Sequence, residues 1–527
     1  MNAKIVAGGL LLLVFTSTSG IAQTSIDIPQ QTFGLLDAIQ QTLAKHPNIL
    51  LGARQVDISR GVLQQASGQF DTVLGANGQH SRTITPLTKL QQAQAQAAGV
   101  TASSQTTESS SYAASVQKEF RNGITIGPQI QVNRLADNLQ DLSGLNQSTI
   151  AFQVILPLLR GRGHNVVGAQ EMSARFTVDA TLFQLNHTIA QQLASCAVQY
   201  WNVVAAKENL QIFSNSEARG KAYLDDVRTL IDADRVAKGE INQVVANLAD
   251  RTSSRIQAEQ AVLDAQQALA LSMGMTTREL RTFPQPIDPL PDWTQSEAPA
   301  VTPSLIQSFT DRALQNRGDL LAANEHERAA EVLVPAARNV LRPQLNLGLS
   351  LGYSGLLEGT NYGRIFGSPF YNLGGPTATG SLTYSFAPRN NVGRGELAQA
   401  EGSYQQAVIQ RSDIERTIAS NVSSAMIDLA SSIARLQKAR EAVNAYRVAL
   451  EGEQEKFRLG ISQLVNVLTI EDRLTNALSQ ALSAQLNYAT AIENLRFATG
   501  TIVDLNKQTQ TLEKSTFLVP PFDWGAK

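Results

Sequence analysis

Charge is scarce in this sequence, and so are long apolar runs. Only 17% of the 527 residues are charged, and the formal net charge is −2. A net charge this close to zero predicts no bulk attraction to nucleic acid or to anionic membranes. We therefore expect no nucleic-acid partner. No stretch reaches the roughly 18 consecutive apolar residues that predict a transmembrane helix.

The first 22 residues predict a secretory signal peptide. Lys4 supplies the positive charge, residues 5–15 the short apolar core, and Gly20-Ile21-Ala22 a small-x-small cleavage site. The apolar core is too short to cross a bilayer. We therefore expect an exported chain whose mature part begins at Gln23.

Cysteine is nearly absent. Cys196 is the only one, so the chain can form no internal disulfide. Leu193, Ala197 and Val198 surround it at helical spacing, which favours a buried packing residue over a reactive thiol. No cysteine stands directly after the expected cleavage site, so we also expect no N-terminal lipid anchor.

Recognisable catalytic motifs are lacking as well. The five histidines lie far apart in the chain, and none belongs to a two-histidine zinc motif: His46, His80, His164, His187 and His326. Gly352-Tyr353-Ser354-Gly355 is one residue short of a nucleophile elbow. Gly161-Arg162-Gly163 and Gly393-Arg394-Gly395 fit turns better than phosphate loops. We therefore expect no enzyme activity, no metal and no cofactor.

Proline is missing from two long segments, and both predict helical rods. One runs from Arg389 to Val519, and within it apolar residues recur in steps of four or three: Leu474, Leu478, Leu482, Leu486, Ala489, Ile492 and Leu495. Their mean step of 3.5 residues is a coiled-coil period. Gly460 interrupts this segment, which predicts antiparallel helices over 391–458 and 461–499. The other segment, 158–283, is interrupted in the same way at Gly239.

Other segments alternate apolar and polar side chains, which predicts strands with two different faces. They lie at about 70–80, 112–133 and 149–156 in the first half, and at about 344–353 and 380–387 in the second half. Residues 85–110 are polar and low in complexity, so we expect a mobile loop there. Shorter helices are expected over 35–67, with a bend at His46-Pro47-Asn48, and over 304–341.

The two halves repeat one design of helix, strands, long helix and helix. At an offset of 271 residues, Leu43 and Leu74 fall on Leu314 and Leu345 without a gap, and such self-similarity indicates an internal duplication. Six of the eighteen prolines lie between 284 and 303. We expect a first repeat over 23–275, a proline-rich linker over 276–303, a second repeat over 304–500 and a periplasmic tail over 501–527.

The strands are too few to close a barrel within one chain. Four are well supported, and the 112–132 hairpin makes six if it joins the wall, whereas single-chain bacterial barrels begin at about eight. Taken singly, an alternating strand could equally cover a soluble core. Beside rods whose apolar seams need neighbours, however, the strands favour an oligomer that is mainly α with a membrane β part.

Three motifs carry a resemblance to a known family. They are the junction Leu156-Pro157-Leu158-Leu159-Arg160-Gly161, the strand entry Arg342-Pro343-Gln344-Leu345 and the turn and helix over 457–468. Across essentially the whole mature chain, the sequence resembles the outer-membrane efflux proteins, the TolC-like outer-membrane factors. The resemblance implies a homotrimer in which each repeat gives two strands to a trimeric transmembrane β-barrel in the outer membrane. It also implies that the long antiparallel coiled-coil helices form a periplasmic α-barrel tunnel.

The same resemblance implies a function. It is that of a passive exit duct in a tripartite efflux pump or type I secretion system, carrying drugs, small molecules or secreted protein. The expected partners are outer-membrane lipid, a periplasmic adaptor and an inner-membrane transporter. An exported coiled-coil scaffold or adhesin remains the alternative. A periplasmic adaptor fits less well, because it needs only one helical hairpin and no lipid-facing strands.

The resemblance also implies a periplasmic gate near Gly460. The matching positions are Phe457, Gly460, Ser462, Asn466, Thr469 and, in the first repeat, Val245. The family's namesake has an arginine and two aspartates after the glycine, so an acidic ring is not expected here. These residues predict a gate closed by packing and neutral hydrogen bonds, with nearby Glu471 and Asp472 on a solvated outer face.

Overall fold

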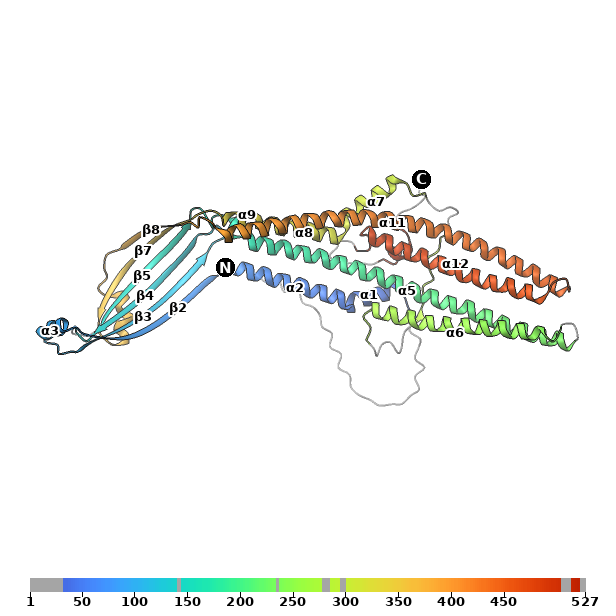
Figure 1. Ribbon diagram of the computed structural model, residues 1–527, viewed down its shortest axis with the longest axis horizontal. Coiled ribbons are helices and arrows are strands. Elements are labelled where there is room, and N and C mark those ends of the chain that lie inside the picture. The colour runs from blue at the N-terminus through green and yellow to red at the C-terminus, as the bar shows by residue number, and fades with distance from the viewer. Residues whose placement is uncertain are drawn as a thin grey trace, which may run out of the picture.

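The computed structural model describes residues 32–139, 144–233, 237–276, 285–293, 300–503 and 513–521. The expected signal peptide lies outside these residues, as do parts of the expected 276–303 linker and of the 501–527 tail. Figure 1 shows an elongated molecule with strands at one end, and with the ends of two long helical hairpins at the other. Among the described residues, no helix is both long enough and apolar enough to cross a membrane.

Two long antiparallel hairpins form the body of the molecule. The second-repeat hairpin joins α11 (Asn391–Arg458) to α12 (Leu464–Ala498), and the first-repeat hairpin joins α5 (Ala169–Asp232) to α6 (Glu240–Ser272). The expected helix over 391–458 is confirmed. Its partner starts three residues later than expected, because the chain needs a turn after Gly460, whose φ of +74° only glycine adopts easily.

Shorter helices flank the long hairpins on the side toward the strands. In the first repeat, α1 (Leu35–Lys45) and α2 (Pro47–Ser67) meet at His46, so the expected bend is confirmed. Proline at the first position of α2 explains it, since that position needs no N–H donor. In the second repeat, the expected 304–341 helix is divided into α7 (Pro303–Asn316), α8 (Gly318–Glu331) and α9 (Leu333–Asn339).

The strands form one antiparallel sheet in the order β2-β3-β4-β5-β7-β8. They are β2 (Thr72–Pro86), β3 (Ser104–Glu119), β4 (Thr125–Asp137), β5 (Leu145–Pro157), β7 (Gln344–Glu358) and β8 (Thr377–Ser385). The hairpin near 112–132 is therefore a full member of the sheet. The first repeat contributes four strands and the second two, which corrects the two strands per repeat that the resemblance implies. The reason is the β3–β4 hairpin, which is inserted between β2 and β5.

The expectation of a mobile loop over 85–110 is wrong. β2 continues to Pro86, α3 (Lys89–Ala97) occupies the middle and β3 begins at Ser104. The pairs from Thr85 with Gln105 to His80 with Ser110 show that the ladder continues through this polar stretch. Backbone pairing satisfies the peptide groups whatever the side chains are, so the polar composition gave no sign of it.

The main core lies where α1, α5, α6 and α12 pack together midway along the hairpins. Tyr200 and Trp201 of α5 are fully buried there, with their rings edge to face at 5.3 Å. Cys196 is fully buried in the same cluster, so its expected packing role is confirmed. Burial raises the pKa of its thiol to about 11, which keeps it protonated.

The remaining described elements are short. They are β1 (Thr32–Phe33), which pairs with β6 (Gln285–Pro286), together with η1 (Gly68–Phe70), α4 (His164–Val167), α10 (Tyr362–Gly367), η3 (Ser368–Phe370) and α13 (Ser515–Leu518).

Candidate functional site

The first candidate region is the sheet, one face of which is apolar. The register sets apolar side chains opposite one another along this face: Leu74 with Val116, Ile130 with Ile150, Phe152 with Leu351 and Leu347 with Leu382. Several of them stay uncovered in the single chain, and Leu351 and Leu382 are each 65% exposed. An apolar band of this kind, which ends where the same face becomes polar at Ser110, Arg134 and Ser148, marks contact with a membrane or another protein.

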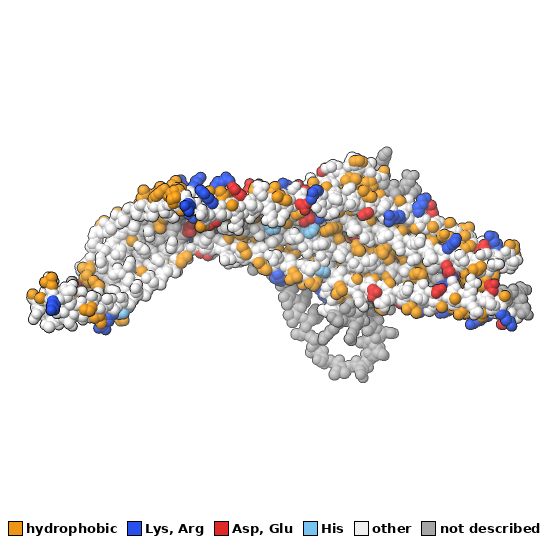
Figure 2. Space-filling view, in the orientation of Figure 1, with side chains coloured by type: hydrophobic (Ala, Val, Ile, Leu, Met, Phe, Trp, Pro, Cys, Tyr) orange, Lys and Arg blue, Asp and Glu red, His pale blue; other side chains and the backbone are white. Residues whose placement is uncertain are grey.

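The other face of the sheet carries neutral hydroxyl and amide groups. The Ser111 hydroxyl donates a hydrogen bond to Asn133 Oδ1 at 2.9 Å, and Gln131 Nε2 donates to the same oxygen at 3.0 Å. Ser350 and Thr379 pair on this face between β7 and β8. The space-filling view shows a sheet surface that is largely neither hydrophobic nor charged (Figure 2). Such a face suits contact with water without selecting ions by charge.

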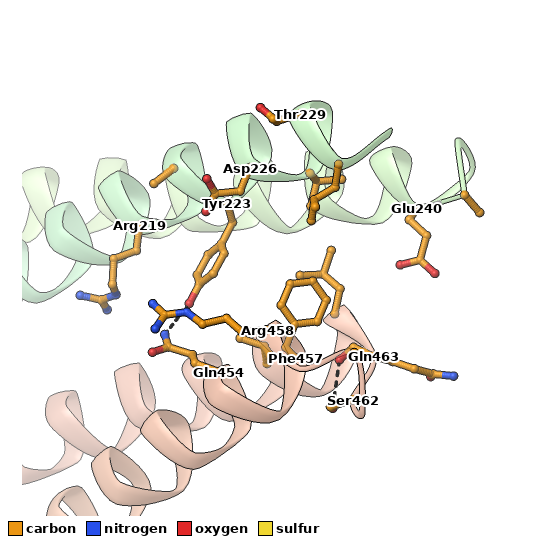
Figure 3. Close-up of a pocket in the computed structure, with 17 residues that line it drawn as sticks. Arg219, Tyr223, Asp226, Thr229, Glu240, Gln454, Phe457, Arg458, Ser462 and Gln463 are labelled. Carbon is orange, nitrogen blue, oxygen red and sulfur yellow. Dashed lines mark hydrogen bonds between the residues drawn. The ribbon is translucent and has the colours of Figure 1, made fainter. Parts of the chain in front are cut away.

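The second candidate region is a cleft between the tips of the two helical hairpins. Its volume is about 1020 Å³, and it is lined by the end of α5, the start of α6 and the α11–α12 turn. Figure 3 shows Tyr223 of α5 and Gln454 of α11 facing one another across it, and Gln454 Nε2 donates to the Tyr223 hydroxyl at 2.7 Å. Burial raises the pKa of Tyr223, so its hydroxyl stays neutral.

Three of the expected gate residues, Phe457, Gly460 and Ser462, line this cleft. The Ser462 hydroxyl hydrogen-bonds to Glu453, which lowers the pKa of that carboxyl, and Asn466 Nδ2 donates to Ser462 Oγ at 3.2 Å. The other two expected residues do not join them. The Thr469 hydroxyl donates to its own helix at Val465, and Val245 of α6 is 47% exposed.

Just behind the cleft, a buried ionic cluster joins the two hairpins. Arg251 of α6, only 5% exposed, donates from Nη1 to Glu471 Oε1 at 2.9 Å and from Nη2 to Asp472 Oδ1 at 2.9 Å. Arg219 of α5 donates from Nε to the same Glu471 carboxylate at 2.6 Å. Arg251 Nη1 also reaches the Ser216 carbonyl at 3.1 Å. The Glu471 carboxylate of α12 thus binds arginines of both α5 and α6.

The expected solvated outer position is therefore wrong for Glu471, which has no exposed surface, whereas Asp472 is 44% exposed. Glu471 is buried because two guanidinium groups neutralise it, the condition under which a charge can leave water. Sequence reasoning missed Arg251 and Arg219. Their partner lies more than 200 positions along the chain, and no local motif records that pairing.

A second buried carboxyl lies farther up the hairpins. Glu493 of α12 is fully buried, and the Trp201 indole donates to its Oε1 at 3.5 Å. Burial raises the pKa of Glu493 well above its usual range. The group is therefore held as a neutral acid within the helical core. It lies far from the cleft, and it bears on stability rather than on the site.

Comparison with known proteins gives the same picture. The family model described as "Outer membrane efflux protein" matches residues 309–501. The outer membrane protein TolC of Vibrio cholerae is 22% identical over 329 residues, covering 60% of this chain and 70% of that protein. The pyoverdine export outer membrane protein OpmQ of Pseudomonas putida is 26% identical over 333 residues. That alignment covers 62% of this chain but only 63% of OpmQ, less than two thirds of its length.

Solved structures share the fold over most of the chain. The outer-membrane channel OprN superposes with a TM-score of 0.65 at 16% identity, covering 89% of this chain and 90% of OprN. CusC superposes with a TM-score of 0.65, also at 16% identity, over 92% of this chain and 99% of that chain. Residues 309–501, most of the second repeat, thus match the outer membrane efflux protein family, and the chain shares the fold of these solved channels over both repeats.

Proposed function

We propose that three copies of this chain form a passive exit duct through the outer membrane, the final conduit of a tripartite efflux pump or type I secretion system. The observation that carries the proposal is the two-faced sheet at the end of two long helical hairpins. Its apolar face suits lipid and its neutral polar face suits a water path. The helices continue that path as a periplasmic tunnel.

The need for further copies follows from the edges of the sheet. β2 and β8 are the outer strands, and each has only one neighbour among the described strands. In lipid, unpaired edge groups are costly, so the edges must meet edges of other copies. One six-stranded sheet falls below the roughly eight strands of the smallest single-chain barrels. Three copies, as the family resemblance implies, close the wall.

The hairpin tips supply the gate and the docking surface in this proposal. Phe457, Ser462 and Asn466 close the tunnel by packing and hydrogen bonds, one of which Ser462 donates to the Glu453 carboxylate. The cluster around Arg251 holds the two hairpins together. Leu459 and Ile461, 64% and 73% exposed at the α11–α12 turn, offer apolar contacts to a periplasmic adaptor, which in turn connects to an inner-membrane transporter. Thr469 and Val245 border this region without lining the cleft.

The domain division is part of the same proposal. Residues 23–275 and 304–500 act as two matching repeats, each giving one helical hairpin to the tunnel wall. The described parts of the 276–303 linker and of the 501–527 tail, residues 285–293 and 513–521, pack around the middle of the hairpins. Arg440 of α11 donates from Nη1 to the Trp293 carbonyl at 3.0 Å, and Arg496 of α12 donates to the Val519 carbonyl at 2.6 Å, which supports this placement.

Planar-bilayer recording of the purified, detergent-extracted protein tests the proposal. We expect discrete conductance steps with weak ion selectivity, because the polar face of the sheet is neutral. Absence of any conductance would remove the channel function.

An exported scaffold or adhesin is the competing function, since the long helices alone would also serve as spacers. Fractionation separates the two. A scaffold leaves washed outer membranes in high salt or carbonate, whereas a chain with a lipid-facing sheet stays in them until detergent is added.

A further inference from the structure

The β3–β4 hairpin is built into the sheet with the same two faces as the other strands. On its apolar side, Tyr112 pairs with Val132 and Ala114 with Ile130. The intervening positions are polar, as in Ser111 opposite Asn133. The register runs without a break from β2 through this hairpin to β5. A hairpin projecting away from the wall would not need this alternation.

The inner turn of the hairpin is fixed at the boundary between sheet and helices. Arg121 forms a bidentate pair with Glu171 of α5, with both nitrogen–oxygen distances at 2.6 Å. Its guanidinium also lies 4.6 Å from the centre of the Phe70 ring, in η1 after α2. Asn122 accepts a backbone hydrogen bond from Gly163 at 3.1 Å. The turn is thereby held against η1 and the start of α5.

The distal half of the hairpin is held by a segment of the other repeat. The Phe366 ring of α10 lies 5.2 Å from the Tyr112 ring, and Val132 beside it is 4% exposed. α10 belongs to the connection between β7 and β8. The hairpin is therefore held at its inner turn and near the middle of its strands by parts of the chain outside it, as expected of a structural member of the wall.

The second repeat shows what the wall looks like without an insertion. There α9 leads into β7, and β8 leads directly into α11. In the first repeat, η1 and α2 lead into β2, and β5 leads into α4 and α5, but β3 and β4 stand between the two strands. The sheet order thus contains two strands more than a duplicated four-strand plan would give.

We propose that the β3–β4 hairpin widens the outer-membrane pore, so that three copies close an eighteen-stranded wall in place of a twelve-stranded one. This inference rests on the trimeric duct proposed above. With strands about 4.8 Å apart and tilted about 40°, eighteen strands give roughly 36 Å between opposite backbones, and twelve give roughly 24 Å. The cross-section enclosed by the backbone rises about twofold.

The lining of the wider pore also bears on its cargo. Charged side chains of the polar face lie only at strand ends, as with Glu119, Asp137 and Glu358. The positions between them carry neutral side chains, mostly hydroxyl and amide groups with some glycine and small apolar residues. A wide neutral lining sorts solutes by size rather than by sign of charge, so the outer pore accepts bulky cargo of either sign.

Deletion of residues 104–137 tests the proposal. β2 ends and β5 begins at the distal end of the sheet, so removing this segment connects them there and leaves both helix junctions in place. β2 and β5 are antiparallel in the sheet order, so they can pair directly. Deletion of residues 89–97 is the matched control, because α3 lies beyond the sheet and pairs with no strand.

The measurement is electron cryo-microscopy of each protein in lipid nanodiscs, viewed along the pore axis. We expect eighteen strands and the wide wall for the full chain and the control, and twelve strands with the narrow wall for the 104–137 deletion. A full-length trimer with twelve wall strands and the hairpin outside it would overturn the inference while leaving the duct intact. If the deletion variant does not assemble, the strand count of the full chain decides alone. A single-copy particle would overturn the duct and the inference together.

Discussion

Removing Arg251 should loosen the contact between the two helical hairpins. Arg251→Met keeps a side chain of similar length but removes the guanidinium, which makes two hydrogen bonds to Glu471, at 2.9 and 3.2 Å, and one to Asp472. Glu471 then remains buried with Arg219 as its only cationic partner. Breaking a buried ion pair from one side costs about 3–5 kcal/mol, and the remaining arginine puts the loss near the lower end.

The loss is best measured as local opening of the hairpin tips. A loss of about 3 kcal/mol increases the population of locally open states on the order of 100-fold, since each 1.4 kcal/mol is tenfold. Hydrogen exchange followed by mass spectrometry should show that loss of protection in the facing parts of α6 and α12. The strands should keep their protection, because none of them contacts the cluster.

Two further variants make the reasoning refutable. Arg228→Met removes an arginine from α5 whose side chain is 57% exposed and pairs, among the described residues, with Asp225 at 3.3 Å, so its effect should stay below about 1 kcal/mol. In Arg251→Met/Glu471→Met, the buried carboxylate is removed as well, and the remaining Arg219, whose side chain is 38% exposed, can turn to water. Most of the protection should therefore return. If Arg251→Met behaves like Arg228→Met, the cluster does not hold the hairpins together.

Three other substitutions test the remaining assignments. Leu351→Arg places a charge on the apolar face of β7 and should destabilise the membrane-inserted form by about 2–4 kcal/mol. The neighbouring Ser350→Arg, on the polar face, should assemble normally. A heat-modifiability gel assay distinguishes the two outcomes. Glu493→Gln should raise the melting temperature at about pH 8. Burial raises the pKa of Glu493, so at this pH the carboxylate of the unfolded chain must take up a proton on folding, which lowers the stability of the unmodified protein, whereas Gln needs no proton. That gain should vanish toward about pH 4, where the carboxyl is protonated in both folded and unfolded chains; a gain independent of pH would contradict it. Gly460→Ala should lower the melting temperature, because alanine disfavours the φ of +74° at this position. Gly452→Ala, in a helix interior with open space around it, should instead raise the melting temperature, with a gain of up to about 1 kcal/mol in the free energy of unfolding.

Much of this architecture is predictable from the sequence, because the signals are local and periodic. The 3.5-residue recurrence over 474–495 and the break at Gly460 locate α11 and α12 to within three residues. The strict alternation from Leu345 to Tyr353 predicts β7. The extension of β2 and β3 through residues 80–86 and 104–110 is not predictable in the same way, since ladder hydrogen bonds leave no trace in a polar, low-complexity composition.

Only part of the candidate site is predictable from the sequence in the same way. Phe457, Gly460 and Ser462 lie in a motif, and the structure places them together in the cleft. Arg219, Arg251 and Glu471 meet only through the packing of one repeat against the other, so the burial of Glu471 could not be anticipated from its neighbours. The sheet order is likewise not predictable from local sequence, because the pairing of β5 with β7 is set by tertiary structure.

The central claim is that the sheet of one chain cannot close a wall and must be completed by two further copies. The mass of the purified particle tests this most directly, measured by native mass spectrometry of the detergent-solubilised protein with the detergent stripped in the gas phase. The account predicts three chains per particle, together with loss of solubility when detergent is withdrawn. A stable particle of one chain that stays dissolved without detergent would contradict it.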